Sequence, residues 1–137
     1  MASGWCLVGS YDMDEDTRVK SYKDLLVWQN GIELVKQVYV LTQQFPSEEK
    51  FGLVSQMRRA GVSVPSNIAE GQARKSTAEF TQFLSITQGS LAELETQLIV
   101  SIELGFCSQG GTADLFTAIH RLQKMLHSLR TKLATNH

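Results

Sequence analysis

Hydrophobic side chains recur every three or four positions along four stretches of the chain, which is the spacing of one face of an α-helix. The first stretch covers about residues 23–44. It carries two neighbouring apolar rows, one of Leu25, Trp28, Ile32, Val35 and Tyr39 and one of Val27, Leu34, Val38, Leu41 and Phe45. Because this face is wider than a two-stranded coiled coil requires, it predicts burial against several helices. Pro46 ends the stretch, since proline cannot continue a helix.

Capping signals separate the other three predicted helices. Ser47 is the predicted cap of the second helix, which Gly71 and the polar residues after it end. Ser76 and Glu79 have the spacing of a capping box at the start of a third helix. Gly105 is its expected C-terminal cap.

Two further small-residue positions complete this picture. Gly89 and Ser90 inside the third helix indicate a close helix crossing, and Thr112 is the expected cap of the fourth helix. That last helix has a heptad of apolar residues: Leu115, Ile119, Leu122, Leu126, Leu129 and Leu133.

These elements define the expected fold. No alternating strand pattern occurs along the sequence, and short connections place successive helices antiparallel. We therefore predict an all-α, up-down-up-down four-helix bundle over residues 21–137. Residues 1–20 show no lasting period and carry four acidic against two basic side chains, a net of −2. We interpret them as a short acidic N-terminal tail, mostly disordered.

The second helix has two contrasting faces. Its apolar row is Val54, Met57, Gly61, Val64 and Ile68, and the phase of this row is the same before and after Pro65, which favours one kinked helix. Polar residues occupy the opposite side: Gln56, Arg59, Ser63, Ser66 and Glu70, with Asn67 beside them. This row is either a face in contact with water or a subunit interface, since several nearby residues are small enough for another helix to approach.

Composition limits the function classes. A chain of 137 residues with 42% hydrophobic and 20% charged residues suits one domain. A formal net charge of −1 gives no overall electrostatic case for nucleic acid. Cys6 and Cys107 fit no metal or redox spacing, and no apolar run approaches the roughly 20 residues that span a bilayer. We expect a soluble cytoplasmic protein with no membrane association.

Catalytic and metal chemistry find little support in the sequence. His120 and His127 are seven residues apart, about 10 Å along a helix, which is too far to share one metal directly. Glu93 and Glu95 diverge on a helix and lack the Glu-x-x-His motif of di-metal bundles. Cys107 has no basic neighbour in sequence that would lower the pKa of its thiol. We expect no enzyme activity, no catalytic residue, no metal and no cofactor.

Basic side chains are the better candidates for function. Arg58, Arg59, Arg74 and Lys75 bracket the second helix, and Arg121, Lys124, Arg130 and Lys132 lie on the fourth. Arginine binds phosphate in a bidentate manner, so these residues could contact nucleic acid. They could equally form ion pairs within the protein, for example Arg59 with Glu70 or with Glu93.

Three segments, in order and at matching spacing, resemble one family. They are YKDLLVWQ in the first helix, FPSEEKFGLVSQMRRAGVSVPSNIAEG across the second and GSLAELETQL in the third. Together they are similar to the four-helix-bundle proteins encoded in 23S rRNA intervening sequences, over about residues 21–133. The resemblance implies a homopentamer. A more distant similarity is to the accessory variability determinant of diversity-generating retroelements, which binds nucleic acid and works with a reverse transcriptase.

The resemblance also marks positions on two helices. They are Gln56, Arg58, Arg59, Ser63, Pro65, Asn67, Glu70, Gly71 and Arg74 on the second helix and Gly89, Ser90 and Glu93 on the third. We predict a non-enzymatic homo-oligomer that associates with RNA, DNA or a ribonucleoprotein such as a reverse transcriptase complex. The alternative is an oligomeric protein-binding scaffold without nucleic-acid affinity.

Two sets of site residues follow from this prediction. The predicted nucleic-acid contacts are Arg74, Lys75, Arg121 and Lys124. The predicted subunit interface is Gln56, Arg59, Ser63, Ser66, Asn67 and Glu70.

Overall fold

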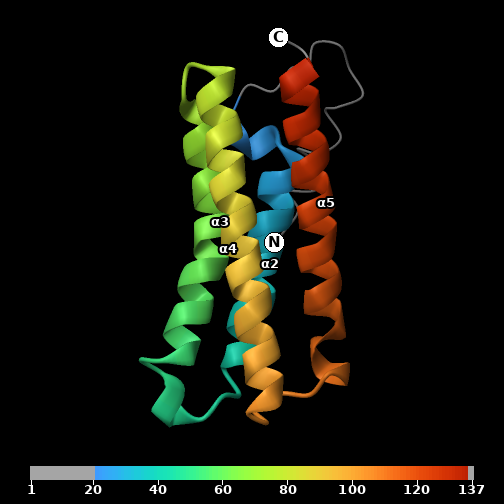
Figure 1. The fold of residues 1–137 in the computed structure, drawn as a ribbon. Coiled ribbons are helices and arrows are strands. Elements are labelled where there is room, and N and C mark those ends of the chain that lie inside the picture. Colours follow the sequence, from blue (N-terminus) through green and yellow to red (C-terminus); the bar gives the residue numbers. More distant parts are fainter. Residues whose placement is uncertain (1–20, 136–137) are drawn as a thin grey trace.

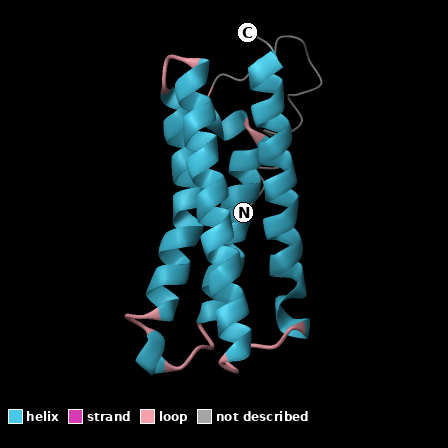
Figure 2. Ribbon diagram, viewed as in Figure 1, coloured by secondary structure: helices cyan, strands magenta, loops and turns pink. Residues whose placement is uncertain are grey.

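Four long helices follow one another in the computed structural model, which describes residues 21–135. They are α2 (Leu26–Thr42), α3 (Leu53–Ala73), α4 (Thr77–Glu103) and α5 (Ala113–Thr135), with short 3-10 turns η2 (Tyr22–Asp24), η3 (Ser47–Glu49) and η4 (Gly110–Thr112). Successive helices run in opposite directions (Figure 1), and no strand occurs in the part of the chain that the structure describes (Figure 2). The predicted four-helix bundle is confirmed. The predicted tail, residues 1–20, lies outside the described residues.

The four helices enclose one core. α3 packs most extensively against α4, α2 lies between α3 and α5, and α5 also contacts α4. The predicted apolar rows face inward, except that Tyr39 at the end of the first row is exposed. Within the last heptad Leu115, Ile119, Leu122 and Leu126 are buried, whereas Leu129 and Leu133 are half-buried. The largest fully buried side chains are Leu34, Met57, Ile68, Leu84, Leu91, Leu94, Leu98, Ile119, Leu122 and Leu126.

Pro65 lies inside α3, and the helix continues through it, as the unbroken apolar phase predicts. The proline ring is buried against α2. A Cβ atom added to Gly31 would lie 3.3 Å from the Cβ of Pro65, so α2 approaches the ring as closely as a glycine allows. Packing of the ring stabilises a helix that local propensity alone would interrupt.

The third predicted helix starts and ends where the sequence indicates. The Ser76 hydroxyl accepts a hydrogen bond from the Glu79 backbone N–H (3.1 Å). In a full capping box the Glu79 carboxylate would accept a hydrogen bond from the Ser76 backbone N–H. Here it accepts from the Ser76 hydroxyl instead (3.2 Å). At the other end Gly105 adopts a φ of 81°. The N–H of Phe106 then reaches the Ser101 carbonyl (2.9 Å), which is the Schellman arrangement.

Two predicted caps are wrong. Ser47 begins the 3-10 turn η3, and α3 starts only at Leu53, after Gly52, whose backbone (φ −110°, ψ −110°) interrupts the helix. The Glu49 carboxylate instead accepts from the Leu53 N–H (3.3 Å). Thr112 is buried and donates to the Ser108 carbonyl (2.9 Å), whereas the Ser108 hydroxyl accepts from the Gly111 N–H (2.9 Å).

The close helix crossing is not where Gly89 predicts it. A Cβ atom on Gly89 would meet nothing within 4 Å, so this glycine faces open space. The close approaches involve other glycines, Gly61 against Val38 and Gly71 against Phe83. Within residues 21–135 no helix has the combination of length and apolar character needed to cross a bilayer.

Candidate subunit and nucleic-acid surfaces

The six residues of the predicted subunit interface lie along one side of α3 and are accessible. Gln56, Arg59, Ser66 and Glu70 are exposed, and Ser63 and Asn67 are half-buried. Ser63 donates to the Ala60 carbonyl (2.6 Å), and Asn67 donates to the Ser63 carbonyl (2.8 Å). Both side chains therefore lie against the helix backbone and project little from this face.

Three of the small residues expected to admit another helix are used inside the bundle instead. Ala60, Gly61 and Gly71 are buried, and the two glycines contact α2 and α4, respectively. The small side chains that remain on the accessible side of α3 are Ser63, Ser66 and the half-buried Ala69.

Arg59 is exposed and forms no ion pair with any residue in the described range. The two carboxylates predicted as possible partners, those of Glu70 and Glu93, contact other residues. Glu70 pairs with Arg74, one turn away (2.8 Å). Glu93 accepts a long hydrogen bond from the side-chain amide of Gln97 (3.4 Å). Arg59 is thus a cation without an ion-pair partner among the described residues, near the N-terminal end of the predicted interface.

Gln97 of α4 carries an unmet hydrogen-bonding group inside the bundle. Its side chain is 8% exposed, and its Oε1 atom has no partner. One turn further along α4, the Ser101 hydroxyl contacts the Met57 sulfur (3.4 Å), which places this side of α4 against α3. A buried acceptor left without a donor costs about 1–3 kcal/mol.

The predicted nucleic-acid contacts do not form one site. Arg74 and Lys75 lie where α3 passes into α4, at the top of the bundle in Figure 1. Arg121 and Lys124 lie on α5, which packs between α2 and α4 and not beside α3. Only the pair on α5 shares one stretch of surface, because residues three apart on a helix are neighbours.

Arg74, one of the predicted nucleic-acid contacts, already has partners within the bundle. It pairs with Glu70 (2.8 Å) and lies over the Phe83 ring, 5.0 Å from the centroid. Lys75, Arg121 and Lys124 are exposed, and no ion pair within the described residues involves them. These three are the available cations of the predicted set.

Two other arginines have structural contacts. Arg58 donates to the Thr42 hydroxyl (2.9 Å) and lies 4.3 Å from the Tyr39 ring centroid, so it joins α3 to α2. Arg130 donates to the Gln88 side chain and joins α5 to α4.

A polar contact between α4 and α5 was missed from the sequence. His120 Nε2 lies 2.8 Å from the Glu95 carboxylate, which also accepts from Gln123 (3.3 Å). The hydrogen bond from His120 is the main cause that lowers the pKa of Glu95, and burial opposes it. Sequence placed Glu95 and His120 on polar sides of two helices, but the relative register of those helices, which brings them together, has no signature in a single sequence.

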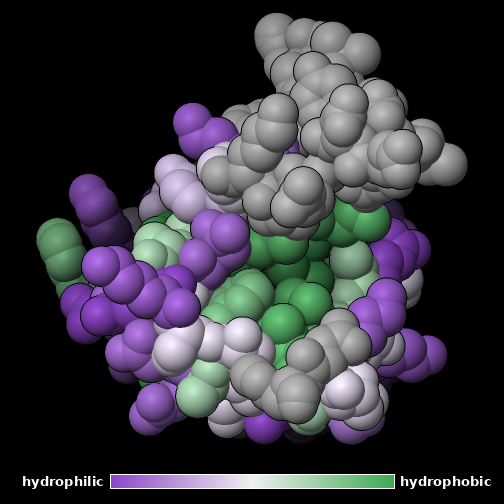
Figure 3. Space-filling model, turned by 90° about the horizontal axis from the view of Figure 1, so that it is seen from above, coloured by the Kyte–Doolittle hydropathy of each residue, from purple (hydrophilic) through white to green (hydrophobic). Residues whose placement is uncertain are grey.

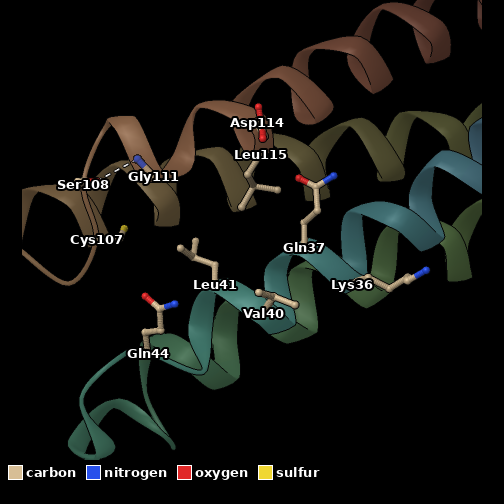
Figure 4. A pocket seen from close by; sticks show the side chains of 10 residues that line it. All are labelled: Lys36, Gln37, Val40, Leu41, Gln44, Cys107, Ser108, Gly111, Asp114 and Leu115. Carbon is tan, nitrogen blue, oxygen red and sulfur yellow. Dashed lines mark hydrogen bonds between the residues drawn. The ribbon is translucent and has the colours of Figure 1, made fainter.

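A second missed feature is a groove of about 500 Å³ at the end of the bundle where α4 passes into α5. Figure 4 shows Cys107 and Ser108 on one side of it and Val40 and Leu41 of α2 on the other. Burial raises the pKa of the half-buried Cys107 thiol. No group of three or more His, Cys, Asp or Glu side chains within residues 21–135 could hold a metal ion.

Comparison with known proteins identifies the family of the chain and solved structures with a similar fold. Residues 23–128 match the family described as 23S rRNA-intervening sequence protein. The fold is similar to the crystal structure of a protein with unknown function from the S23 ribosomal protein family of Bacteroides thetaiotaomicron. The TM-score is 0.71 and the identity 24%, with 77% of this chain and 98% of that chain covered. No curated protein matches the chain.

Proposed function

Because the chain belongs to the 23S rRNA-intervening sequence protein family, we propose that it is a non-enzymatic cytoplasmic module that self-associates and binds RNA or a ribonucleoprotein. The observation that carries the proposal is the accessible polar row of α3, in which Arg59 forms no ion pair with any described residue. The proposed number of copies is five, as the family resemblance implies.

Self-association accounts for one unmet charge on this face. Arg59 has no ion-pair partner among the described residues and needs a carboxylate. A second copy packed on the α3 side can supply one, since Glu70 is exposed on the same row.

RNA association rests on the cations that the bundle leaves unpaired. Lys75, Arg121 and Lys124 are too few on one chain to hold a polyanion firmly. Repetition by five copies turns weak individual contacts into a multivalent surface. The chain's own net charge of −1 makes this binding local and strongly dependent on salt.

Two measurements on the full chain test the proposal. Light scattering at micromolar concentration is expected to give a multiple of 15.3 kDa, and a stable species of 15.3 kDa would overturn self-association. Electrophoretic shifts with a mixed-sequence single-stranded RNA are expected to weaken steeply as salt rises.

The alternative is an oligomeric scaffold that binds protein partners only. It is favoured by the apolar side chains exposed on α4, Ile86, Ile99, Val100 and Leu104. An oligomer that shows no RNA shift at low salt would select this alternative. A monomer would exclude both functions.

A further inference from the structure

A groove of about 420 Å³ lies between the start of α2 and the second half of α5. Its floor is apolar, formed by Leu25 and Val27 on one side and Met125 and Leu129 on the other. Leu26 at its edge is 47% exposed. Figure 3, which looks onto the end of the bundle where α2 starts and α5 ends, shows hydrophobic surface with hydrophilic residues to its sides. An apolar groove of this kind is typical of a surface that another segment covers.

Two cations flank the floor. Lys124 and Lys132 line the groove from α5, eight residues and therefore about 12 Å apart along the helix. Both are exposed, and no ion pair within residues 21–135 involves either of them. The one acidic residue of the lining, Asp24, lies on the α2 side. A segment with apolar side chains for the floor and carboxylates for the α5 side would therefore complement this groove in charge.

The chain contains such a segment at a suitable distance. Residues 11–16 read YDMDED, in which apolar Tyr11 and Met13 alternate with acids. In extended backbone, alternate side chains point to opposite sides. Asp24 and Leu25, which line the groove, are three and four residues after Ser21, so the described part of the chain begins close to this surface in sequence.

Chain length permits the contact. Asp16 is five residues before Ser21, a reach of about 17 Å in extended backbone, and Asp12 is nine residues before it, a reach of about 30 Å. The groove begins at Asp24 and Leu25, only three and four residues after Ser21, so a segment of this length can return to it. Closing so short a loop costs little chain entropy, because that cost grows only slowly with loop length.

We propose that residues 11–16 of the same chain lie in this groove, with Tyr11 and Met13 on its apolar floor and the acidic side chains beside Lys124 and Lys132. Lys124 belongs to the cations assigned above to RNA, so the segment competes with RNA for this surface. This competition rests on the proposed function, whereas the contact itself does not.

Zero-length cross-linking of the full chain tests the contact. At low salt, a water-soluble carbodiimide joins carboxylates directly to amines, and mass spectrometry maps the products. Residues 12–16 are expected to cross-link to Lys124 and Lys132 and not to Lys50, an exposed lysine at the opposite end of the bundle. Equal yields at Lys50, or no cross-links to α5, would overturn the proposal.

An isotope mixture identifies which chain supplies the segment. In equal amounts of ¹⁴N- and ¹⁵N-labelled protein, each cross-linked peptide pair is expected to carry a single isotope. Mixed pairs would show that a second copy occupies the groove and would overturn the intramolecular contact.

Competition with RNA is measured separately. Asp12→Asn, Asp14→Asn and Asp16→Asn together are expected to tighten RNA binding by at least about threefold at low salt, because fewer acids compete with phosphate. Glu48→Gln, Glu103→Gln and Asp114→Asn remove three exposed acids elsewhere and serve as the matched control. Equal tightening by both variants would overturn the competition. If the parent binds no RNA, the proposed function fails while the cross-linking result still decides the contact.

Discussion

Gly71 of α3 lies so close to Phe83 of α4 that a Cβ atom on the glycine would be 2.5 Å from the Cβ of the phenylalanine. Gly71 is buried. The ring of Phe83 also lies under the Arg74 guanidinium. The glycine is therefore required for contact between α3 and α4 at this end of the bundle, and not for access by another subunit.

Gly71→Ala is expected to destabilise the protein. The atom that the new methyl group meets is next to the α4 backbone and cannot rotate away, so the two helices must separate. Overpacking of this kind costs about 1–3 kcal/mol, and a urea titration measures it. Gly89→Ala is the matched control, because that glycine is helical and faces open space, and alanine there should leave stability unchanged or higher. Equal stability of the two variants would contradict the packing described here.

Leu122→Ala and Leu126→Ala are each expected to lower the free energy of unfolding by about 2–5 kcal/mol. Both side chains are almost fully buried, at 1% and 0% exposure. Leu104→Ala provides the comparison, since that leucine is 58% exposed. Thermal melts of the two core variants that coincide with the parent's would mean that α5 is peripheral.

The sequence predicted which residues form the core more reliably than where helices begin. Apolar periodicity depends on many side chains, so it correctly carried α3 through Pro65. A helix start depends on a few local hydrogen bonds, and Gly52 together with the Glu49 carboxylate moved the start of α3 away from Ser47.

The candidate site was predictable only in part. Helical phase placed Arg59, Ser63 and Glu70 on one accessible side of α3. Which charges pair, however, depends on side-chain rotamers and on the register between helices. Sequence therefore missed the bond between Glu95 and His120, and it left Arg74 free where the structure pairs it.

Arg59→Ala is expected to weaken self-association. If a carboxylate of a neighbouring copy pairs with Arg59, truncation leaves that charge unpaired in the interface, at a cost of about 3–5 kcal/mol. Light scattering over a dilution series should then show dissociation at higher protein concentration than for the parent. Lys50→Ala removes an exposed cation far from this face and should not change the mass. An unchanged mass for Arg59→Ala across the series would place the interface elsewhere.

Reversal of the available cations is expected to abolish RNA binding. Lys75→Glu, Arg121→Glu and Lys124→Glu remove the unpaired members of the predicted set and should leave the oligomer intact, because none of them contacts the α3 row through an ion pair. Adding Arg74→Glu should contribute less to RNA affinity and more to instability, since Arg74 is committed to Glu70 and Phe83. Unchanged RNA affinity in the triple variant would favour the protein-scaffold function.

The lowered pKa of Glu95 predicts that the stability of the protein depends on pH. Its pKa is lower in the folded chain than the ordinary value of 4.5, chiefly because of the hydrogen bond from His120. The folded protein therefore binds fewer protons than the unfolded chain near this pH. The resulting stabilisation is complete above about pH 4.5 and is lost as the pH falls through the lower, folded pKa. Urea titrations at several pH values should show a smaller acid loss for Glu95→Gln than for the parent, and identical pH profiles would contradict this role.

The unequal packing of the four helices has a consequence for how the bundle opens. α3 and α4 form its best-packed pair, whereas α5 has thinner contacts with both of its neighbours, and both grooves described above run along it. Local opening begins where the fewest apolar contacts must separate. We therefore expect α5 to separate from the other three helices first, so its backbone amides should exchange with deuterated water before those of α3 and α4. A ligand that holds α5 in place would slow that exchange without touching the rest of the core.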